Sequence, residues 1–592
     1  MHKKYTVPIP SAPGKITLKK LSAGTYIYYE YAREYDKQKK FNIPRRACIG
    51  KLDPSDGTRM LPNEKYHDFF PSETGVEYDS CRSSCLRVGS FLLISRFAEK
   101  LGLSAWLQGR FGAKDGGLIL DLASYLLIAE KNAAQHYPDY AYNHPLFTPD
   151  MRIYSDTRVG TLFKEGIGRD DVIAFTEWWN DSRDHRRRIY ISYDSTNKIS
   201  QAGDIELVEG GHAKDGPDGS PIVNIAMATD VSESMPLFYE DYCGSIADVS
   251  QFEQMVEKAQ ALGYRSIGFI LDRGYFSKAN IEDLDGRKYS FLIMAKGRRN
   301  LVSSLVLGVK GSFEDKSANT IWEYEVNGTT VEAKLYSEDR KTRYFHIYYS
   351  AEKYAAERSC FETCIKKMAG VLDRMLGKKC GKLNLKVYGR FFDLTLSDDK
   401  DKVLLMYSKN NEKIDDYIRY CGYYCIISSE RMTAREALLL YKSRDCSEKL
   451  FSADKTFTGS SAERIQSVEA LRSKIFIEFI ALILRSRLYH AINGHVLATG
   501  RRPNYMNVVS ALGELEKIEL IRIGDGVYHL DHAITARQKD ILSVFALGVD
   551  DIKDRCRALS RTLAAIDNRH AEGGSPESDV RDDSAVETEE EV

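Results

Sequence analysis

The order of strand and helix signals between residues 189 and 296 constrains the fold of this chain more than any other feature of its 592 residues. Three apolar, β-branched runs come first, at 189–194, 221–230 and 235–244. An amphipathic helical pattern, an apolar run, a short helical stretch and a last apolar run then follow in turn. These alternating periodicities predict an α/β sheet whose later strands are separated by helices.

Two acidic residues belong to the predicted strands. Ile189, Ile191 and Tyr193 alternate with their neighbours, so Asp194 is expected to leave the opposite face of the strand. Asp272 closes the run SIGFILD. Three strands, a helix, a fourth strand, a helix and a fifth strand is the order of an RNase H-like fold, in which the first and fourth strands are neighbours. Asp194 and Asp272 should then face each other across adjacent strands, near enough to share a metal ion.

A third acidic residue, Glu448, lies in the string YKSRDCSEKLFSADK. Tyr441 and Arg444 precede it at helical spacing, and Lys455 follows seven residues later. The capping box at 433–436 predicts where a helix begins. On one continuous helix, Tyr441, Arg444 and Glu448 share a face, and Lys455 joins them if the helix extends that far. The apolar helix that comes next along the chain is expected to pack behind this site.

Three carboxylates from separate segments are what divalent metal ions need for phosphodiester chemistry. Mg²⁺ keeps several waters and takes only a few protein carboxylates, so three acids suffice for two ions about 3.5–4 Å apart. We expect Asp194 to bridge the ions, Asp272 to hold one and Glu448 the other. Each acid also has an ordinary interpretation, because Asp272 can cap a turn and Arg444 can form a surface ion pair with Glu448.

The remaining patterns predict further domains around this α/β core. The segment at 320–336 predicts a β-hairpin with Asn327-Gly328 at its turn. The predicted domains are a basic β-rich N-terminal domain (1–75), a helical DNA-binding module (76–185), the first part of the RNase H-like core (186–300), a β-rich insertion subdomain (301–420), the second part of the core (421–500), a C-terminal helical region (501–560) and an acidic disordered tail (561–592).

The charge distribution points to a polyanionic partner without requiring one. The net charge is −1, yet residues 1–51 hold twelve Lys or Arg against three acids. This excess either binds a polyanion such as DNA or is a solvated surface. The C-terminal residues 572–592 hold nine acids and one Arg, too polar a composition to order itself.

The cysteines and the apolar segments indicate an intracellular protein. The eleven cysteines include three Cys-x3-Cys pairs with no His pair nearby, which favours reduced thiols over a zinc cluster. No N-terminal stretch resembles a signal peptide. The most apolar stretch, 475–484, is short and contains Glu478, so we expect a buried helix rather than a membrane span.

These residues resemble the DDE transposases of the IS-four-like insertion sequences. The string Tyr441, Arg444, Glu448 and Lys455 matches the four-residue signature of that family without a gap. The block YDSTN around Asp194 is similar to its first catalytic block. The segments GGHAKDGPDGSPIVNIAM and LDRGYFS are similar to two further family motifs.

The resemblance implies an RNase H-like fold and a Mg²⁺-dependent DNA transposase, with Mn²⁺ as a substitute metal. It implies that Tyr441 and Arg444 help to hold a flipped base and nearby phosphates, and that Lys455 contacts the DNA of the transposon end. Trp322 is a candidate to stack on that base, although a core position would be its ordinary role. The expected partners are the double-stranded inverted repeats, target DNA and a second copy of the chain in a synaptic homodimer, and the expected location is the cytoplasm, at the nucleoid.

Two alternatives stay open at this point. One is a catalytically silent, transposase-derived protein that keeps only DNA binding. The other is a different RNase H-like nuclease, such as a resolvase or a hydrolase of RNA:DNA hybrids. The Arg and Lys around Glu448 and the large insertion argue against that second alternative.

Overall fold

A computed structural model shows the chain as two compact units. The first unit comprises residues 1–168, 456–460 and 473–592, and the second comprises 169–455 and 461–472. The structure describes residues 7–12, 14–21, 24–36, 40–54, 56–70, 82–200, 205–211, 213–214, 217, 219–246, 248–295, 299–381, 384–398, 402–445, 462–463, 465, 467–500, 507–522 and 527–571.

The N-terminal part of the first unit is an antiparallel sheet with the strand order β1-β5-β4-β3-β2. Its core consists of Ile27, Ile49, Met60 and Tyr66, onto which partly buried aromatic side chains pack. The expected β-rich character of this region is therefore observed. The elements are β1 (Val7–Pro8), β2 (Ile16–Leu21), β3 (Gly24–Asp36), β4 (Phe41–Leu52), β5 (Arg59–Pro62) and α1 (Glu64–Phe69).

Several of the basic residues in this sheet are neutralised by acids of the same sheet. Arg33 Nε lies 2.6 Å from Glu30 Oε1, and Arg46 Nη2 lies 3.1 Å from Glu30 Oε2. Arg45 Nη2 lies 2.6 Å from Glu34 Oε2. The side chain of Glu30 is buried, so its charge needs such partners. The arginines of β3 and β4 therefore have a structural role beside any contact with a polyanion.

The rest of the first unit joins helices from the N-terminal half of the sequence to its C-terminal region. β6 (Cys85–Arg87), β20 (Glu519–Arg522) and β21 (Tyr528–Leu530) form one antiparallel sheet with β20 in the centre. The helices are α2 (Gly89–Lys100), α3 (Leu103–Ala129), α4 (Tyr137–Asn143), α5 (Asp156–Thr161), α16 (Val508–Leu515), α17 (Ala536–Val544) and α18 (Val549–Ala571), with short helical turns at η2 (Ala134–His136), η3 (Pro149–Met151) and η4 (Leu162–Gly166).

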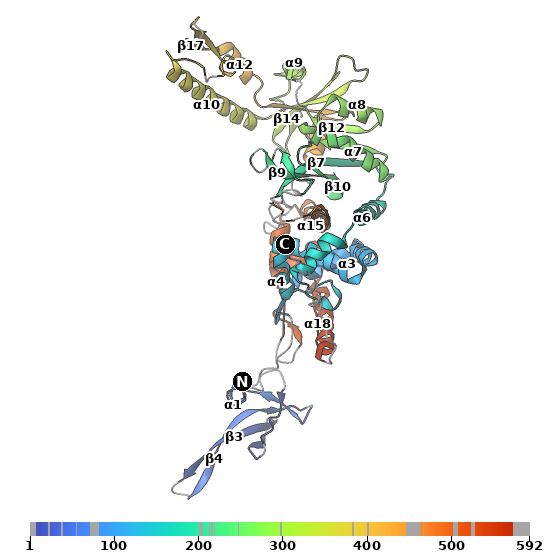
Figure 1. Cartoon of the computed structure of the whole chain (residues 1–592), viewed down its shortest axis with the longest axis vertical. Helices are drawn as coiled ribbons and strands as arrows, with labels where there is room; N and C mark the ends of the chain where they lie inside the picture. The colour runs from blue at the N-terminus through green and yellow to red at the C-terminus, as the bar shows by residue number, and fades with distance from the viewer. Residues whose placement is uncertain are drawn as a thin grey trace, which may run out of the picture. The chain divides into compact units, whose positions relative to one another are not determined.

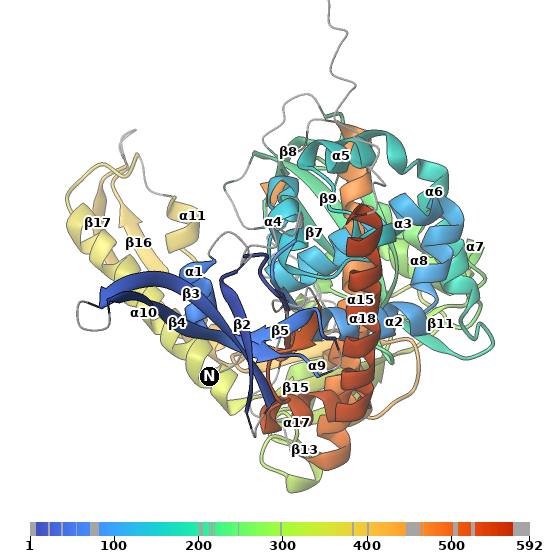
Figure 2. The same cartoon turned by 90° about the horizontal axis from the view of Figure 1, so that it is seen from below.

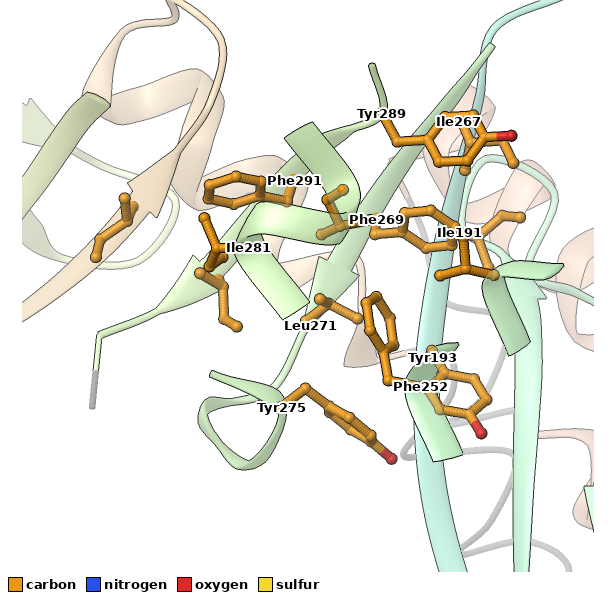
Figure 3. Packing of buried hydrophobic residues seen from close by; sticks show 14 of the residues in the cluster. Ile191, Tyr193, Phe252, Ile267, Phe269, Leu271, Tyr275, Ile281, Tyr289 and Phe291 are labelled. Atoms are coloured by element: carbon orange, nitrogen blue, oxygen red, sulfur yellow. The ribbon is translucent and has the colours of Figure 1, made fainter. Parts of the chain in front are cut away.

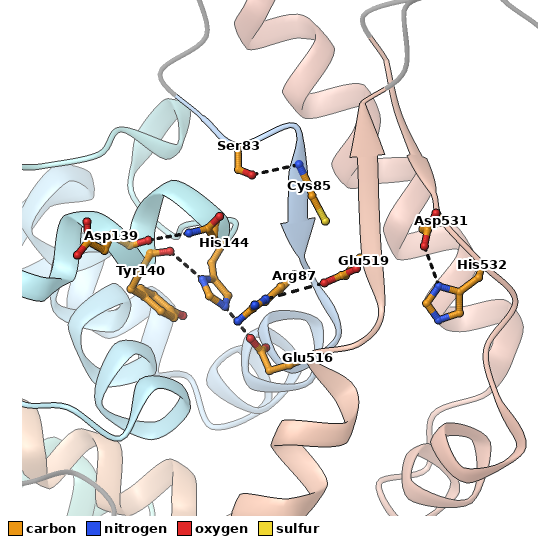
Figure 4. Close-up of polar contacts among 11 residues, drawn as sticks. Ser83, Cys85, Arg87, Asp139, Tyr140, His144, Glu516, Glu519, Asp531 and His532 are labelled. Carbon is orange, nitrogen blue, oxygen red and sulfur yellow. Dashed lines mark hydrogen bonds and ion pairs between the residues drawn. The ribbon is translucent and has the colours of Figure 1, made fainter. Parts of the chain in front are cut away.

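Polar contacts tie the two sequence regions together in this unit. His144 Nε2 lies 2.7 Å from Glu516 Oε2, and Arg87 Nε lies 3.9 Å from Glu519 Oε1 (Figure 4). The buried carboxylate of Asp121 accepts the backbone N–H groups of Phe147 and Thr148 at 2.6 and 3.1 Å. Burial raises the pKa of Asp121 to about 7. The helical module and the C-terminal region thus pack as one body, and the domain boundaries drawn from the sequence stay predictions.

The apolar helix α15 (Val468–Thr499), which was expected to pack behind the acidic residues, belongs mostly to the first unit. Its residues from Ser473 onward belong to the first unit, and only 468–472 belong to the second. Phe476 and Ile480 are fully buried, and the Phe476 ring lies 6.4 Å from that of Phe111. A helix that is apolar on every side needs partners on every side, which a site on one face could not supply.

The second unit is built on a mixed sheet with the strand order β10-β9-β7-β11-β12-β18-β15-β14-β13. Five of these strands, β7, β9, β10, β12 and β14, are labelled in Figure 1. β7 and β11 are parallel neighbours, as the predicted order of strands requires, and β12 lies parallel on the other side of β11. This arrangement is consistent with an RNase H-like core. The strands are β7 (Ile189–Ser200), β8 (Glu209–Gly211), β9 (Ser220–Asp230), β10 (Met235–Cys243), β11 (Ile267–Leu271), β12 (Ser290–Met294), β13 (Thr320–Ile321), β14 (Val326–Ala333), β15 (Arg343–Tyr349), β18 (Tyr423–Ser428) and β19 (Ala462–Glu463).

One face of this sheet carries the main core of the unit. Tyr193 from β7 and Phe269 from β11 pack against Phe252 and Tyr275 on this face (Figure 3). The ring centroids of Phe252 and Phe269 lie 5.6 Å apart, and those of Tyr193 and Tyr275 lie 5.3 Å apart. The helical elements of the unit outside the insertion are α6 (Arg169–Asp181), α7 (Asp248–Ala261), η5 (Arg273–Tyr275), α8 (Lys278–Gly286), α9 (Arg299–Val309), η6 (Ser317–Asn319) and α13 (Ala434–Lys442).

The opposite face of the sheet is covered by α13. Leu438 and Tyr441 of this helix pack with Ile270, Leu292 and Ile426 in a second buried cluster. Side chains alternate between the two faces along β7, so Tyr193 lies on the face that carries the main core, and the residues before and after it lie on the face that α13 covers. The side chain of Asp194 therefore leaves β7 on the face that α13 covers.

The turn of the predicted hairpin lies elsewhere than expected. Asn327 and Gly328 are inside β14, where Asn327 pairs with Thr320, and the turn is formed by residues 322–325. The Asn327 amide donates to Thr320 Oγ1 at 3.1 Å instead of serving a turn. A Cβ on Gly328 would lie 3.0 Å from the Tyr348 ring, so this glycine permits close packing within the sheet.

The insertion differs from the expected β-rich subdomain, because β13, β14 and β15 extend the main sheet. A separate core follows them, in which Phe361, Ile365 and Leu372 pack with Phe392 and Leu404. The β16–β17 hairpin lies beside the long helix α10 (Figure 2). The elements of this part are α10 (Ala351–Met375), α11 (Leu385–Tyr388), β16 (Phe392–Leu396), β17 (Leu404–Lys409) and α12 (Asn411–Ile418).

The described cysteines are free thiols. Cys421 and Cys425 are buried, and Cys360 and Cys364 are exposed on α10. α18 continues to Ala571, past the residue at which the tail was expected to begin. Within the described ranges, every helix is too short or too polar to span a membrane.

Candidate active site

The first two candidate acids lie side by side on neighbouring parallel strands, Asp194 in the middle of β7 and Asp272 directly after the last residue of β11. Tyr193 of β7 pairs with Leu271 of β11, and Asp194 and Asp272 are the next residues along the chain. The two carboxylates are close enough for the charge of Asp272 to raise the pKa of Asp194. Asp272 begins the short turn η5 with an extended backbone, which ends the strand there. This juxtaposition follows directly from the register of the sheet.

Several elements share the end of the sheet at which these acids lie. β15 runs parallel to β12, because both pair antiparallel with β18. The carboxyl ends of β11, β12 and β15 therefore lie at one end of the sheet, beside Asp194 in the middle of β7, and we call this end the acidic end. β14 is antiparallel to β15 and begins at the acidic end, so the turn 322–325 that precedes it lies there as well.

The environment of Asp194 makes its ionised form dependent on nearby cations. Burial is the largest influence and raises its pKa, and the charge of Asp272 acts in the same direction. Lys214, Arg444 and the backbone N–H of Ser195 lower it. The Ser195 N–H donates to Asp194 Oδ1 at 2.9 Å. A carboxylate in this position is stable only with positive charge nearby, which these cations or a metal ion can supply.

Arg444 reaches the acids from α13. The helix begins at a capping box formed by Thr433 and Glu436, as predicted. It ends at Lys442, earlier than the continuous helix expected from the sequence. Arg444 is in the turn that follows, where its N–H donates to the carbonyl of Tyr441 at 3.2 Å.

This early end of the helix still brings Arg444 to the acids. Arg444 Nη1 lies 3.4 Å from Asp272 Oδ1, and its guanidinium lies 5.4 Å from the centroid of the buried Tyr441 ring. The guanidinium is thus held between an aromatic ring and a carboxylate, with only 11% of the Arg444 side chain exposed. An arginine fixed in this way can clasp a phosphate beside the acids.

Two of the candidate residues, Glu448 and Lys455, lie outside the described residues. Across the described ranges, no three His, Cys, Asp or Glu side chains gather closely enough to hold a metal ion. The donors that are described are carboxylate oxygens, which are the ligands that Mg²⁺ prefers. Asp194 and Asp272 therefore fit a Mg²⁺ site in chemistry, and a third acid would complete it.

Trp322 is exposed rather than buried. It lies in the turn 322–325 at the acidic end, with 74% of its surface accessible. The neighbouring Tyr324 is close to α13, since the Lys442 ammonium lies 5.8 Å from its ring centroid. Arg435 of the same helix pairs with Glu323. These contacts hold the turn against α13 and leave the indole ring open to a flat partner such as a base.

Lys214 is a site residue that was not singled out from the sequence, although it lies in the motif-like segment GGHAKDGPDGSPIVNIAM. Its Nζ donates to Ser195 Oγ at 3.0 Å and to the Ser195 carbonyl, and its charge lowers the pKa of Asp194. In the sequence it is one lysine in a polar, Gly-rich segment, where a solvated side chain is the ordinary expectation. Only the fold brings this segment back to β7.

Comparison with known families identifies one domain. Residues 200–484 match the family model described as a transposase DDE domain. The match spans just under half of the chain and includes Asp272, Tyr441 and Arg444, whereas Asp194 lies immediately before it. No curated protein matches the chain.

Two solved structures show loose likenesses. The cryo-EM structure of a piggyBac transposase synaptic complex with hairpin DNA is 8% identical, and the alignment covers 81% of this chain and 85% of that chain with a TM-score of 0.35. The crystal structure of the Mos1 mariner paired end complex with Mn is 11% identical and covers 24% of this chain and 52% of that chain, with a TM-score of 0.13. Superpositions this loose carry no information about the site.

Proposed function

We propose that this chain, which carries a transposase DDE domain over residues 200–484, binds the inverted-repeat ends of an insertion sequence and catalyses their cleavage and strand transfer by a cut-and-paste route. The observation that carries the proposal is the juxtaposition of Asp194, within β7, and Asp272, at the end of the adjacent strand β11, with Arg444 beside them. A protein that only bound DNA would have no need to hold two like charges together in a half-buried position.

The acids are assigned to metal binding. Asp194, Asp272 and Glu448 would hold two Mg²⁺ ions, for which Mn²⁺ would substitute. When bound, such a pair of ions activates a water or a 3′-hydroxyl and stabilises the leaving oxygen. Asp194 would serve both ions, because it is the more enclosed of the two described acids. Lys214 and Arg444 offset the negative charge of Asp194.

Three other side chains are assigned to DNA, and Tyr441 is assigned to support one of them. Arg444 would clasp a phosphate next to the acids, and Tyr441 holds its guanidinium in place. Lys455 would contact the end DNA. Trp322 would stack on a base that leaves the duplex, a role that its exposure at the acidic end supports.

The assembly is proposed from the reaction. Joining two ends of one element requires two active sites, so we infer a homodimer on two double-stranded ends, with target DNA as a further partner. A protein that acts on chromosomal DNA in this way would work at the nucleoid in the cytoplasm.

The test is cleavage of labelled inverted-repeat DNA, taken from the sequence that flanks the gene, by purified protein with Mg²⁺. Wild type is expected to nick the end and join the resulting 3′-OH to a second duplex. Asp194→Ala should abolish both steps. Asp283→Ala is a matched control, since it removes an aspartate that pairs with Arg287 on α8, away from the acids. Nicking that persists in Asp194→Ala would refute the proposal, and binding without cleavage under any divalent metal would support the catalytically silent alternative.

A further inference from the structure

The insertion carries a strongly basic stretch that the proposed function has not used. Residues 366–390 hold eight Lys or Arg and one acid, Asp373. That acid is already engaged, because it accepts a hydrogen bond from the Tyr407 hydroxyl at 2.5 Å. The chain as a whole is almost neutral, so this concentration of positive charge is a local property of α10 and the segment after it.

Three of these basic residues share the solvent face of α10. Phe361, Ile365, Met368 and Leu372 mark the buried face of the helix. Lys366, Lys367 and Arg374 are all exposed, and helical spacing of 100° per residue places them on the opposite side. The residues between them on that face are small, namely Ser359, Thr363 and Gly370.

Because these residues are small, this face of α10 is flat. From Ser359 to Arg374 it extends for about 22 Å at 1.5 Å per residue, which is roughly two thirds of a turn of duplex DNA. A polymer backbone can approach such a surface closely, with cations at its margin. Larger side chains between the cations would hold a partner away.

The cations of this face differ from other cations on the same helix. Lys353 and Arg358 form ion pairs with Glu357 and Glu362 one turn further along. Lys366, Lys367 and Arg374 have no carboxylate within 4.0 Å in the part of the chain that the structure describes, and Arg374 Nε donates only to the Gly370 carbonyl. Their charge is therefore not neutralised by these neighbours.

The position of α10 relates this face to the acids. β15 ends at the acidic end of the sheet, and α10 begins two residues later at Ala351. The N-cap Ser350 N–H donates to the Gly422 carbonyl at 3.1 Å, which anchors the start of the helix beside β18. The helix thus leaves the sheet from the same end as Asp194 and Asp272.

We propose that the solvent face of α10 binds the phosphate backbone of double-stranded DNA without regard to base sequence. This inference rests on the proposed function, because it assigns part of the DNA contact of that same enzyme. The cations position the duplex, and the small residues between them let the backbone lie against the helix. Cations beside small residues on a flat face suit contact with phosphates, which positions a duplex and carries no sequence information, so the contact extends the binding site.

The experiment measures DNA affinity across a salt series. Purified full-length protein is titrated onto a fluorescent duplex of arbitrary sequence, and the slope of log Kd against log salt is compared between variants. The triple variant Lys366→Gln, Lys367→Gln, Arg374→Gln should lower the magnitude of the slope by up to about 2.7, since each phosphate contact contributes about 0.9. The matched control Lys353→Gln, Arg358→Gln, Arg419→Gln removes the same charge from ion-paired positions and should leave the slope within about 0.5 of wild type.

A footprint on the wild-type protein keeps the inference testable if the triple variant does not fold. Bound duplex should protect Lys366 and Lys367 from acetylation more than it protects Lys353. Equal salt slopes for the triple variant and wild type, or equal acetylation with and without DNA, would overturn the inference. If wild type cleaves end DNA in either of these cases, the proposed function stands and only the α10 contact fails. A wild-type protein that neither binds nor cleaves DNA would refute both.

Discussion

The substitution Arg444→Ala tests whether Arg444 binds a DNA phosphate or only stabilises the fold. In the structure Arg444 Nη1 lies 3.4 Å from Asp272 Oδ1, which is also what an ordinary stabilising ion pair would show. The two interpretations differ in what the substitution costs. A structural arginine should affect mainly the free energy of unfolding, whereas an arginine that clasps phosphate should affect mainly DNA cleavage.

The magnitude of the stability effect follows from the exposure of the pair. Two unit charges at this distance attract by about 1 kcal/mol in water and about 5 kcal/mol at an effective dielectric constant of 20. Asp272 is 39% exposed and regains water when Arg444 is removed, so the low end applies. We expect Arg444→Ala to lower the free energy of unfolding by about 1 kcal/mol. Loss of a charged hydrogen bond to phosphate, at about 1.5–3 kcal/mol, should slow cleavage by about 10- to 150-fold.

The assay pairs urea denaturation with cleavage of end DNA, and Arg287→Ala is the matched control. Arg287 Nε lies 2.8 Å from Asp283 Oδ1, and 24% of its side chain is exposed. This pair lies on α8, so its loss should cost at least as much stability as Arg444→Ala and leave the cleavage rate within about twofold. A cleavage rate for Arg444→Ala equal to that of Arg287→Ala would refute the assignment. A stability loss above about 3 kcal/mol would show that Arg444 is mainly structural.

Further predictions concern the buried titrating groups, the exposed tryptophan and one glycine. Burial raises the pKa of Asp121 to about 7, so between about pH 4 and 7 the native carboxyl holds a proton that the unfolded chain releases. The free energy of unfolding should therefore fall by up to about 1.4 kcal/mol per pH unit as the pH rises through this range. Asp121→Asn should remove this slope in urea titrations. Burial lowers the pKa of His346 to about 4, so stability should fall by up to about 3 kcal/mol as pH drops from about 6.5 to 4, and a His346→Gln variant that keeps this loss would contradict the argument. Trp322→Ala should change the unfolding free energy by less than about 0.5 kcal/mol but weaken binding of end DNA by about 5- to 150-fold, measured by fluorescence anisotropy. Gly328→Ala should lower the free energy of unfolding by about 1–3 kcal/mol, because a Cβ would meet Tyr348 and Ala434 at 3.0 Å. The control Gly308→Ala on α9, where a Cβ would meet nothing within 4 Å, should leave stability unchanged or raise it. Thermal melting measures both effects.

The core of the second unit could be predicted because its signals are local and periodic. The alternation of apolar residues around Tyr193 predicts which face of β7 is apolar, and the order of the apolar runs along the chain predicts which strands are neighbours. Together these place Asp194 and Asp272 beside each other on adjacent strands, which the register of β7 and β11 bears out. The capping box at Thr433 is equally local, since its partners lie within one turn.

Two predicted features were wrong, one because of packing that is distant in sequence and one because a local signal was overlooked. Asn327-Gly328 has the composition of a turn, yet Gly328 is required by the Tyr348 ring of a neighbouring strand. α13 was expected to continue to Glu448, but it ends at Lys442, and the Ser443 hydroxyl donates to the carbonyl of Leu440 there. Ser is a poor residue for a helix interior because its side chain competes for such carbonyls. That signal was present in the sequence and was outweighed by the spacing of the motif.

The first unit combines segments from both ends of the chain, and no local sequence pattern predicts that these segments pack together. β6 and β20 are only three and four residues long, too short for a period of two to be distinguished from chance. Their pairing is fixed instead by contacts such as that of His144 with Glu516, whose Oε2 lies 2.7 Å from the imidazole Nε2. A buried imidazole beside a carboxylate is stable only while both partners are present, because either one alone would leave an unpaired polar group in the interior. The C-terminal region is therefore a structural part of the helical module, and removing it would expose the surface on which β6 and α2 depend.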